Sequence, residues 1–462
     1  MLRFPVLVLC VALASAADRP NVVIINIDDL GYADIGPFGS TINRTPNLDR
    51  MAAEGCKLTS FYAAPVCSPS RAALMTGSYP KRALPIPHVL FPIGGNGLSP
   101  EEVTIAEVVK TVGYATACIG KWHLGDQPEF LPTRQGFDLY FGLPYSNDMG
   151  PAADGVKSDF GKPLPQDKGK GQPPLPLMRQ ETVVKRVLPD DQCSLVELYT
   201  TEAVTFIKAN REKPFLLYLP HNAVHFPIYP GRAFQQHNPN GNYSDWIEEV
   251  DWSVGQVLDA LRQAGIDDRT LVLFTSDNGG TSRASNAPLK GNKGSTWEGG
   301  IRVPTIIRWP GHIPAGTSVD AISGMIDILP TVAALSGATL PAGRKLDGIN
   351  LLPVLTRAAE AQGHEVFHYF KGFKLEAVRW RQWKLHLGSG ELYDLVRDPG
   401  EANNVAKDHT EVVERVTKLA AEMDLDLGNN GIGPGVRPLG TVANPKPLIG
   451  FDGTVREGFA PK

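Results

Sequence analysis

The chain has 462 residues and a formal net charge of −4. This length is enough to bury a large core, and it predicts one large domain accompanied by a smaller one. Lysine and arginine residues are scattered, apart from short clusters such as the one in residues 162–170. The composition therefore predicts a soluble globular protein and gives no sign of a nucleic-acid partner, which a broad basic patch would indicate.

The N-terminus predicts a secretory signal peptide over residues 1–17. Arg3 precedes a short apolar run at residues 5–13, and Ala14-Ser15-Ala16-Ala17 follows it. A positively charged start, a short apolar stretch and a cleavage site with small residues are typical of a cleaved export signal. No other segment reaches about 18 apolar residues, the length that spans a bilayer. The sequence thus predicts no transmembrane segment and a secreted or periplasmic location, lysosomal in an animal host.

Three apolar runs predict buried strands at residues 21–27, 215–219 and 270–275, and the first of them is rich in β-branched residues. In residues 100–111 and 246–263, apolar side chains recur at three- and four-residue steps, which predicts helices. Strands that alternate with helices indicate an α/β fold with a large, mostly parallel sheet flanked by helices.

The pattern changes at residues 340–365. Short alternating runs follow within residues 377–395, and a helical run extends from Thr410 to about Met423. They predict a smaller C-terminal α+β domain with an antiparallel sheet. Residues 151–189 show no clear periodicity and predict a long surface loop, either a rim of the binding site or an inert insertion. The predicted division is a main domain over 18–345, the smaller domain over 346–427 and an extended tail over 428–462.

Polar side chains follow the predicted strands at the points where they end. Asp28-Asp29 comes after the first strand and Asp277-Asn278 after the third. The carboxyl ends of parallel strands form the ligand site of such a sheet, so these four residues are expected to meet. Carboxylate and carboxamide oxygens suit Ca²⁺ or Mg²⁺ and suit zinc poorly. Adjacent aspartates alone are commonly a solvated turn; the combination of the two pairs predicts a metal site.

Further cationic and basic groups occur near predicted strand ends. Lys121 and His123 follow a short apolar run, and their spacing places both side chains on one side of an extended chain. His221 and His225 follow the second predicted strand, and Lys293 lies in a glycine-rich loop. A fixed cation beside a titratable base suits the handling of an anion. Each motif alone is weak, because surface lysines, buried histidines and glycine-rich turns are common.

Cysteine usage singles out one residue. Four cysteines remain after the predicted signal peptide, fewer than a disulfide-stabilised secreted protein usually has. Cys56, Cys118 and Cys193 are expected to be buried apolar side chains. Cys67 differs because it opens the pentapeptide Cys67-Ser68-Pro69-Ser70-Arg71.

The motifs DD, CSPSR, GKWHLG, HNAVHFP, SDNGG and GNKGSTWEGG occur in that order. Together they resemble the type I sulfatase family of the alkaline-phosphatase superfamily. Residues 130–151 and the region of His225 are most similar to its arylsulfatase A-like branch. The similarity runs from about Asn21 to about Asn404. It implies an alkaline-phosphatase-like fold and hydrolysis of sulfate monoesters, with sulfated carbohydrates as expected substrates and aryl sulfates as artificial ones.

The resemblance also implies a maturation step and a metal ion. Cys67 would be oxidised to formylglycine by a formylglycine-generating enzyme that reads Pro69 and Arg71. One hydroxyl of the hydrated aldehyde would attack sulfur, and the second would then expel sulfate, which a serine could not do. An oxygen of the converted Cys67 would complete a single Ca²⁺ site with Asp28, Asp29, Asp277 and Asn278.

The remaining roles follow from the same resemblance. Arg71 would hold the hydrate near the metal, and His123 would deprotonate its second hydroxyl. His225 or Lys293 would protonate the leaving alcohol, whereas His221 is expected only to support the site. The residues implied as contacts of the substrate sulfate are Lys121, Ser146, His225 and Lys293.

Two alternatives stay open at this point. A related hydrolase could use the same formylglycine on phosphodiesters or phosphonates. A two-zinc phosphatase is disfavoured, because such relatives commonly carry histidine where this chain has Asn278. A catalytically inactive secreted sulfate-binding protein would result if Cys67 stayed a thiol.

Overall fold

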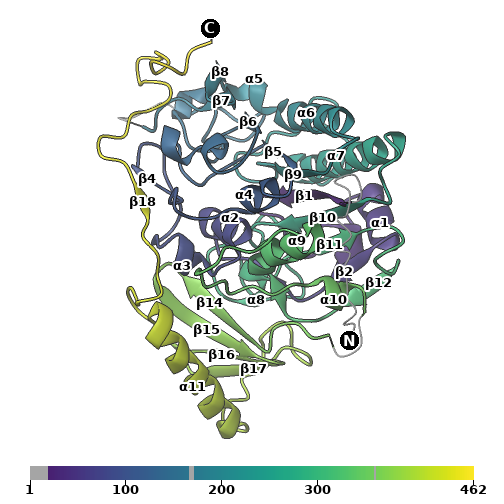
Figure 1. Cartoon of the computed structure of the whole chain (residues 1–462), viewed down its shortest axis with the longest axis vertical. Helices are drawn as coiled ribbons and strands as arrows, with labels where there is room; N and C mark the ends of the chain where they lie inside the picture. Colours follow the sequence, from purple (N-terminus) through teal and green to yellow (C-terminus); the bar gives the residue numbers. More distant parts are fainter. Residues whose placement is uncertain (1–18, 166–170, 358–360, 462) are drawn as a thin grey trace, which may run out of the picture.

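The computed structural model describes residues 19–165, 171–357 and 361–461, so the predicted signal peptide lies outside the described residues. Its centre is a ten-stranded sheet (Figure 1). The strands of this sheet are β1 (Asn21–Ile27), β2 (Cys56–Leu58), β5 (Ala115–Ile119), β6 (Leu139–Gly142), β7 (Pro176–Arg179), β8 (Thr182–Arg186), β9 (Phe215–Pro220), β10 (Thr270–Ser276), β11 (Thr305–Arg308) and β12 (Thr317–Val319).

The order of the strands across the sheet is β12-β2-β11-β10-β1-β9-β5-β6-β7-β8. Its middle part, β10-β1-β9-β5-β6, is parallel throughout. Antiparallel pairings of β11 with β10 and of β7 with β6 extend it on both sides. The predicted α/β fold with a mostly parallel sheet is therefore confirmed.

Helices cover both faces of the sheet (Figure 1). Every residue of β1 is buried, and alternate side chains of the strand enter two different cores. Val22 and Ile24 pack in one core with residues of α2 (Cys67–Thr76), α4 (Ile105–Lys110) and α9 (Ile328–Ser336). Val23 and Ile25 pack in the other with residues of α1 (Pro46–Ala53), α6 (Leu195–Ala209) and α7 (Asn242–Gln263). Burial on both faces explains why the strand has an unbroken apolar sequence.

Two helix predictions need correction at their starts. The segment predicted as a helix over 100–111 is helical only in α4, which begins after Thr104. Thr104 accepts a hydrogen bond from the backbone of Glu107, and the Glu107 carboxylate accepts one from the backbone of Thr104. This capping box fixes the start of the helix, so the residues before Thr104 are not part of it. Conversely, α7 begins at Asn242, four residues before the predicted start at Trp246.

The prediction of a structureless loop over 151–189 is wrong in its second half. Strands β7 and β8 form an antiparallel hairpin there and extend the main sheet through β6. Gln180 lies in the connecting turn with a φ of 55°. Strands of four and five residues are too short to give the period-two pattern that a sequence would reveal.

The smaller C-terminal part contains an antiparallel sheet, as predicted, and its four strands have the order β14-β15-β16-β17. One strand, β14, was not expected from the sequence. The helix α11 packs against β15 and β16 (lower left in Figure 1). The elements are β14 (Val366–Lys371), β15 (Lys374–Trp380), β16 (Trp383–His386), β17 (Glu391–Asp394) and α11 (Thr410–Leu427).

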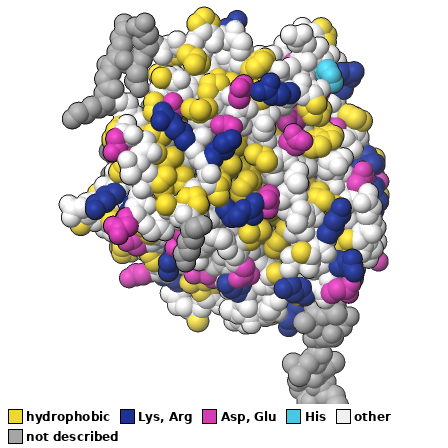
Figure 2. Space-filling view, turned by 90° about the horizontal axis from the view of Figure 1, so that it is seen from above, with side chains coloured by type: hydrophobic (Ala, Val, Ile, Leu, Met, Phe, Trp, Pro, Cys, Tyr) yellow, Lys and Arg dark blue, Asp and Glu magenta, His cyan; other side chains and the backbone are white. Residues whose placement is uncertain are grey.

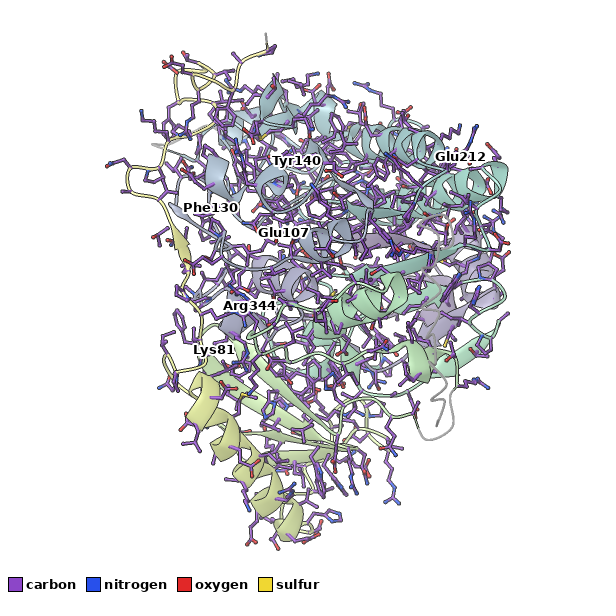
Figure 3. All side chains as sticks on the ribbon, viewed as in Figure 1. Lys81, Glu107, Phe130, Tyr140, Glu212 and Arg344 are labelled. Atoms are coloured by element: carbon purple, nitrogen blue, oxygen red, sulfur yellow. The ribbon has the colours of Figure 1, made fainter. Side chains whose placement is uncertain are left out.

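Residues after α11 run back along the main domain (Figure 1). Strand β18 (Gly440–Thr441) pairs with β4 (Asn96–Gly97). Phe130, labelled in Figure 3, lies against both strands: a Cβ atom on Gly97 would be 2.3 Å from its ring, and one on Gly440 would be 2.7 Å away. The two glycines thus allow the tail to pack closely on this aromatic ring.

Short elements complete the described chain: β3 (Phe61–Tyr62), α3 (Pro80–Ala83), α5 (Pro189–Gln192), α8 (Glu298–Ile301), β13 (Ser323–Gly324) and α10 (Leu352–Leu355). Among the described residues, no helix has both the length and the apolar character that crossing a membrane requires. On the face drawn in Figure 2, lysine and arginine side chains lie among aspartate and glutamate side chains, so charges of both signs are mixed there.

Candidate active site

The predicted site residues meet where the parallel strands end. Five of these strands lead into polar side chains of the site, and β1 and β10 are followed directly by a polar pair. Two other segments reach the same place: the start of α2 and the loop between β10 and α8. The residues are Asp28 and Asp29 after β1, Lys121 and His123 after β5, Ser146 after β6, His225 after β9, Asp277 and Asn278 after β10, Cys67 and Arg71 in α2, and Lys293 in the loop.

Cys67 is the first residue of α2, and 2% of its surface is exposed. Its Sγ lies 3.4 Å from Oδ1 of Asp28 and 3.4 Å from Nζ of Lys293. Burial raises the pKa of the thiol, and the nearby carboxylates of Asp277 and Asp28 raise it further. A cysteine nucleophile reacts as the thiolate, so an unmodified Cys67 is poorly suited to nucleophilic attack.

Arg71 holds several strand ends together. Its Nε and Nη2 donate to Oδ2 of Asp277 at 3.0 and 2.7 Å, and Nη2 also donates to Oδ2 of Asp28 at 3.1 Å. Its Nη1 donates to the backbone oxygen of Lys121 at 2.6 Å. The side chains of the arginine and both aspartates are fully buried. One guanidinium group therefore connects the ends of β10, β1 and β5.

Lys121 continues this network towards β6 and β9. Its ammonium group donates to Oδ2 of Asp28 and, at 3.0 Å, to Oγ of Ser146. Ser146 Oγ lies 3.4 Å from Nδ1 of His225, whose Nε2 is 3.8 Å from Oδ2 of Asp29. Burial raises the pKa of Asp28, but Lys121, His225 and Arg71 outweigh that effect and hold the pKa well below its usual value. Asp28 is therefore ionised.

Lys293 approaches the cluster from the glycine-rich loop. Its Nζ lies 2.6 Å from Oδ1 of Asp29, which also accepts a hydrogen bond from Nδ2 of Asn278 at 2.8 Å. Burial lowers the pKa of Lys293, but the nearby carboxylates of Asp29 and Asp28 outweigh it and raise the pKa well above its usual value. The lysine is thus a permanent positive charge beside Cys67.

His123 is buried, with a φ of 60°, and is held through one ring nitrogen. Its Nε2 lies 3.0 Å from the backbone oxygen of Leu90. A carbonyl can only accept, so Nε2 carries the proton. Burial lowers the pKa of His123, and the charges of Lys121 and Arg71 lower it further, so the ring is neutral. Nδ1 has no hydrogen-bond partner among the described residues and is left as a free acceptor.

His221 does not join this cluster. It is fully buried, and its Nε2 lies 3.2 Å from Oγ of Ser253 in α7. Burial lowers the pKa of His221 to about 3. It packs the strand end of β9 against α7, in agreement with the supporting role expected for it.

The donor set fits a hard divalent cation. Ligand atoms of Asp28, Asp29, Cys67 and His225 all lie within 4.8 Å of one another. In the described part of the chain, Oδ1 of Asp277 and Oδ1 of Asn278 are buried without any hydrogen-bond partner. Buried polar atoms are normally paired, because leaving them unpaired is costly. Carboxylate and carboxamide oxygens are the ligands that Ca²⁺ and Mg²⁺ prefer.

Sequence reasoning missed the residues that support this site. The carbonyl of Leu90, which holds His123, is a backbone group and leaves no signal in the sequence. Lys384 of β16 is fully buried and lies 2.9 Å from Oε1 of Glu298 and 3.0 Å from Oε1 of Glu401. It also donates to the backbone oxygen of Thr296 at 2.7 Å. This ionic cluster ties the segment after Lys293 to the C-terminal sheet.

Comparison with known proteins agrees with the geometry. Residues 20–338 match the family model described as sulfatase, and residues 292–426 match the model described as N-sulphoglucosamine sulphohydrolase, C-terminal. Human arylsulfatase A is 38% identical over an alignment of 443 positions, which covers 86% of this chain and 86% of its own. Mouse N-acetylgalactosamine-6-sulfatase is 36% identical over 88% of this chain and 80% of its own.

Solved structures show the same fold. Ps i-CgsB, in complex with k-i-k-neocarrahexaose, has a TM-score of 0.76 and 30% identity over 88% of this chain and 92% of its own. Phosphonate monoester hydrolase of Agrobacterium radiobacter has a TM-score of 0.62 at 20% identity, a likeness that shows the fold alone. The chain therefore belongs to the sulfatase family, in its arylsulfatase A-like branch, and is a sulfuric ester hydrolase.

Proposed function

We propose that the protein hydrolyses sulfate monoesters of carbohydrates through a formylglycine derived from Cys67 and one bound Ca²⁺. The observation that carries this proposal is the environment of Cys67. The residue lies at the centre of the anion-handling cluster, yet burial and neighbouring carboxylates raise the pKa of its thiol. A cysteine in this position whose raised pKa keeps it protonated is better explained as the precursor of another nucleophile.

The metal would be held by Asp28, Asp29, Asp277, Asn278 and an oxygen at position 67. Bound there, Ca²⁺ would neutralise the sulfate group and polarise its oxygens. Support comes from the two unpaired buried oxygens of Asp277 and Asn278. Arg71 keeps Asp28 and Asp277 oriented and so acts through the two carboxylates.

The substrate sulfate would be bound by Lys121, Ser146, His225 and Lys293. Two fixed positive charges beside Cys67 favour the anionic substrate and the charge that develops as the ester bond breaks. His225 and Lys293 have partly exposed side chains, at 12% and 17%, and therefore mark the side from which the substrate enters. His225 or Lys293 would give a proton to the leaving alcohol.

Proton removal from position 67 would fall to His123. Hydrated formylglycine would supply one hydroxyl to attack sulfur and displace the alcohol, and a second hydroxyl whose deprotonation would release sulfate and restore the aldehyde. The neutral ring of His123, held by Leu90 through Nε2, offers Nδ1 as the acceptor. A buried base with a lowered pKa stays unprotonated, and so ready to accept, down to acidic pH.

Maturation and location belong to the same proposal. The motif Cys67-Ser68-Pro69-Ser70-Arg71 supports a formylglycine-generating enzyme as partner. The predicted signal over residues 1–17 supports export to the periplasm, the cell exterior or, in an animal host, the lysosome. The carbohydrate substrate class is supported by relatives named N-acetylgalactosamine-6-sulfatase and by the neocarrahexaose complex of Ps i-CgsB.

The test is mass spectrometry of the peptide that contains Cys67, from protein made with and without a formylglycine-generating enzyme. We expect the aldehyde only with that enzyme, and sulfate release from an aryl sulfate in proportion to it. Turnover of a phosphodiester, measured in parallel, should be slower than turnover of the aryl sulfate. A faster turnover of the phosphodiester would favour the phosphodiesterase alternative. Turnover by protein with an unmodified thiol, or by Cys67→Ala, would refute the proposed nucleophile.

A further inference from the structure

A groove of about 260 Å³ lies beside the loop that carries Lys293. One wall is formed by residues 295–297, directly after the Lys293 segment. The other wall belongs to the C-terminal sheet and includes Lys371, Lys374 and Glu376. The groove therefore lies where the main domain meets the smaller one, outside the cluster of metal-type ligands.

The groove carries positive charge that the protein does not neutralise. Lys371 and Lys374 flank the turn between β14 and β15, and both are exposed. Within the described residues, neither lysine has a carboxylate within 4.0 Å, although many other lysines and arginines do. The carboxylate among the lining residues, Glu376, accepts a hydrogen bond from Oγ1 of Thr296 at 2.9 Å.

The ammonium group of Lys374 lies near the residues that follow β16, on the same wall of the groove. Its Nζ is 3.8 Å from the place where a Cβ atom on Gly388 would be. The lysine is exposed, so its ammonium group is accessible to a ligand. Two accessible ammonium groups on one wall suit an anionic group of a ligand.

The positive charge continues from the groove to the reaction centre. Lys371 also lines a small cavity whose other walls include Val66 and Gly294, the neighbours of Cys67 and Lys293, as well as His88. Burial lowers the pKa of His88, and repulsion from Lys293 and Lys371 lowers it further, so this imidazole lies within electrostatic reach of both lysines. A basic rim therefore extends from Lys293 past His88 to Lys371.

Groups that suit a sugar lie in the same groove. Trp297 is half-buried, and its ring lies 4.0 Å from the ring of His386 and 3.7 Å from Nζ of Lys290. The hydroxyls of Ser295 and Ser389 also line the groove. An aromatic ring edge with hydroxyl groups nearby can contact the apolar and polar parts of a saccharide.

We propose that this groove binds a second anionic group, a sulfate or carboxylate, of the saccharide whose sulfate ester is hydrolysed. Lys371 and Lys374 are the contacts. This inference rests on the proposed function and refines it, because it identifies the substrate class as an acidic oligosaccharide with at least two anionic groups. The scissile sulfate occupies the reaction centre while the second anion lies in the groove.

The test uses sucrose octasulfate as a polyanionic saccharide probe and isothermal titration calorimetry on Ca²⁺-loaded protein. For the variant K371Q/K374Q we expect the dissociation constant to rise about tenfold, as the loss of two accessible charge contacts implies. The matched control is K208Q/K213Q, which removes two exposed lysines in the last turn of α6 and just after it. Both precede β9, so they lie at the end of this strand opposite to the reaction centre and are remote from the groove.

Equal weakening in both double variants would show only a general attraction of anions and would overturn the proposal, as would no weakening in either. A second measurement compares kcat/KM for a disulfated and a monosulfated disaccharide of the same backbone. The ratio should fall about tenfold in K371Q/K374Q and stay constant in the control. If no sulfated substrate is turned over by formylglycine-containing protein, the proposed function fails, whereas the calorimetric comparison still decides whether the groove binds anions.

Discussion

Arg71 contacts one oxygen of Asp277 twice and leaves the other oxygen free. Nε and Nη2 both donate to Oδ2, at 3.0 and 2.7 Å, whereas Oδ1 has no hydrogen-bond partner among the described residues. Both side chains are fully buried. The arginine thus fixes the orientation of the carboxylate, and the oxygen that remains free is available to a ligand.

Replacement of Arg71 by lysine should therefore damage both stability and activity. A single ammonium group cannot contact Asp277, Asp28 and the Lys121 carbonyl together, so buried carboxylates lose their partner. We expect the free energy of unfolding to fall by about 3–5 kcal/mol. We also expect the rate of aryl sulfate hydrolysis to fall by at least about a hundredfold, since several kcal/mol of transition-state stabilisation depend on the oriented carboxylates. Denaturant unfolding and a sulfate-release assay measure the two effects.

The control for this substitution is Arg134→Lys, because Arg134 forms an ion pair with Glu181 but has a side chain that is 59% exposed. Surface pairs contribute about 0–1 kcal/mol, so its stability should be nearly unchanged. A wild-type Tm for Arg71→Lys would contradict the structural role of the arginine.

Metal removal should lower both activity and stability. A ligand that binds only the folded chain stabilises it by about 2.7 kcal/mol at a concentration of 100 Kd. Dialysis against a chelator should therefore lower the Tm, and Ca²⁺ should restore it at lower concentrations than Mg²⁺ does. In Asn278→Ala, the Ca²⁺ concentration that gives half of the Tm shift should rise at least tenfold. An unchanged Tm after chelation would speak against the metal site.

The buried cluster of Lys384, Glu298 and Glu401 should couple the smaller domain to the main one. Lys384→Met removes the cation and leaves two buried carboxylates without it. Breaking a buried ion pair in this way costs about 3–5 kcal/mol, so the variant should unfold at a lower denaturant concentration. Lys407→Met, at an exposed position before α11, serves as its control. Equal stability of the two variants would disprove the coupling.

Glu249 in α7 should make stability depend on pH. Burial raises the pKa of this carboxyl from 4.5 to about 8. Between those values the folded chain binds more protons than the unfolded one, so this residue lowers stability progressively from pH 4.5 to pH 8. Glu249→Gln, neutral at every pH, should match wild type near pH 4.5 and exceed it by about 5 kcal/mol above pH 8, since each pKa unit corresponds to about 1.4 kcal/mol.

Thermal unfolding at several pH values measures this effect. Glu212→Gln, an exposed residue labelled in Figure 3, should show the wild-type pH profile. A constant difference between Glu249→Gln and wild type from pH 4.5 to 9 would rule out the proposed titration.

The strands and the site chemistry could be predicted from the sequence because both depend on local patterns. The strand over 21–27 is a continuous apolar run, and the aspartates directly after it mark its end. The hairpin of β7 and β8 could not be predicted, because its strands are short and acquire their pairing from β6, which is distant in sequence. Thr104 shows the reverse case: its capping box with Glu107 is visible in the sequence and would have given the start of α4.

The support of the site could not be read from the sequence for a different reason. Lys384 lies in an ordinary alternating strand, and only the folded chain brings Glu298 and Glu401 to it. His123 was identified as a base, but its tautomer follows from the carbonyl of Leu90, which any residue at that position would provide. The roles of Lys384 and of the Leu90 carbonyl depend on which groups the folded chain brings next to them, and the residue type alone does not reveal this.

The burial of Cys67 determines whether its oxidation can follow folding or must precede it. Only 2% of its surface is exposed, and Ser68, Ser70 and Arg71 are at most 1% exposed. No second protein can reach this thiol once the sheet has closed around it, so an enzyme that oxidises it must act on an unfolded chain. Under the proposed function, each copy thus has a single opportunity to become active, before it folds. A copy that folds first keeps its thiol for as long as it stays folded.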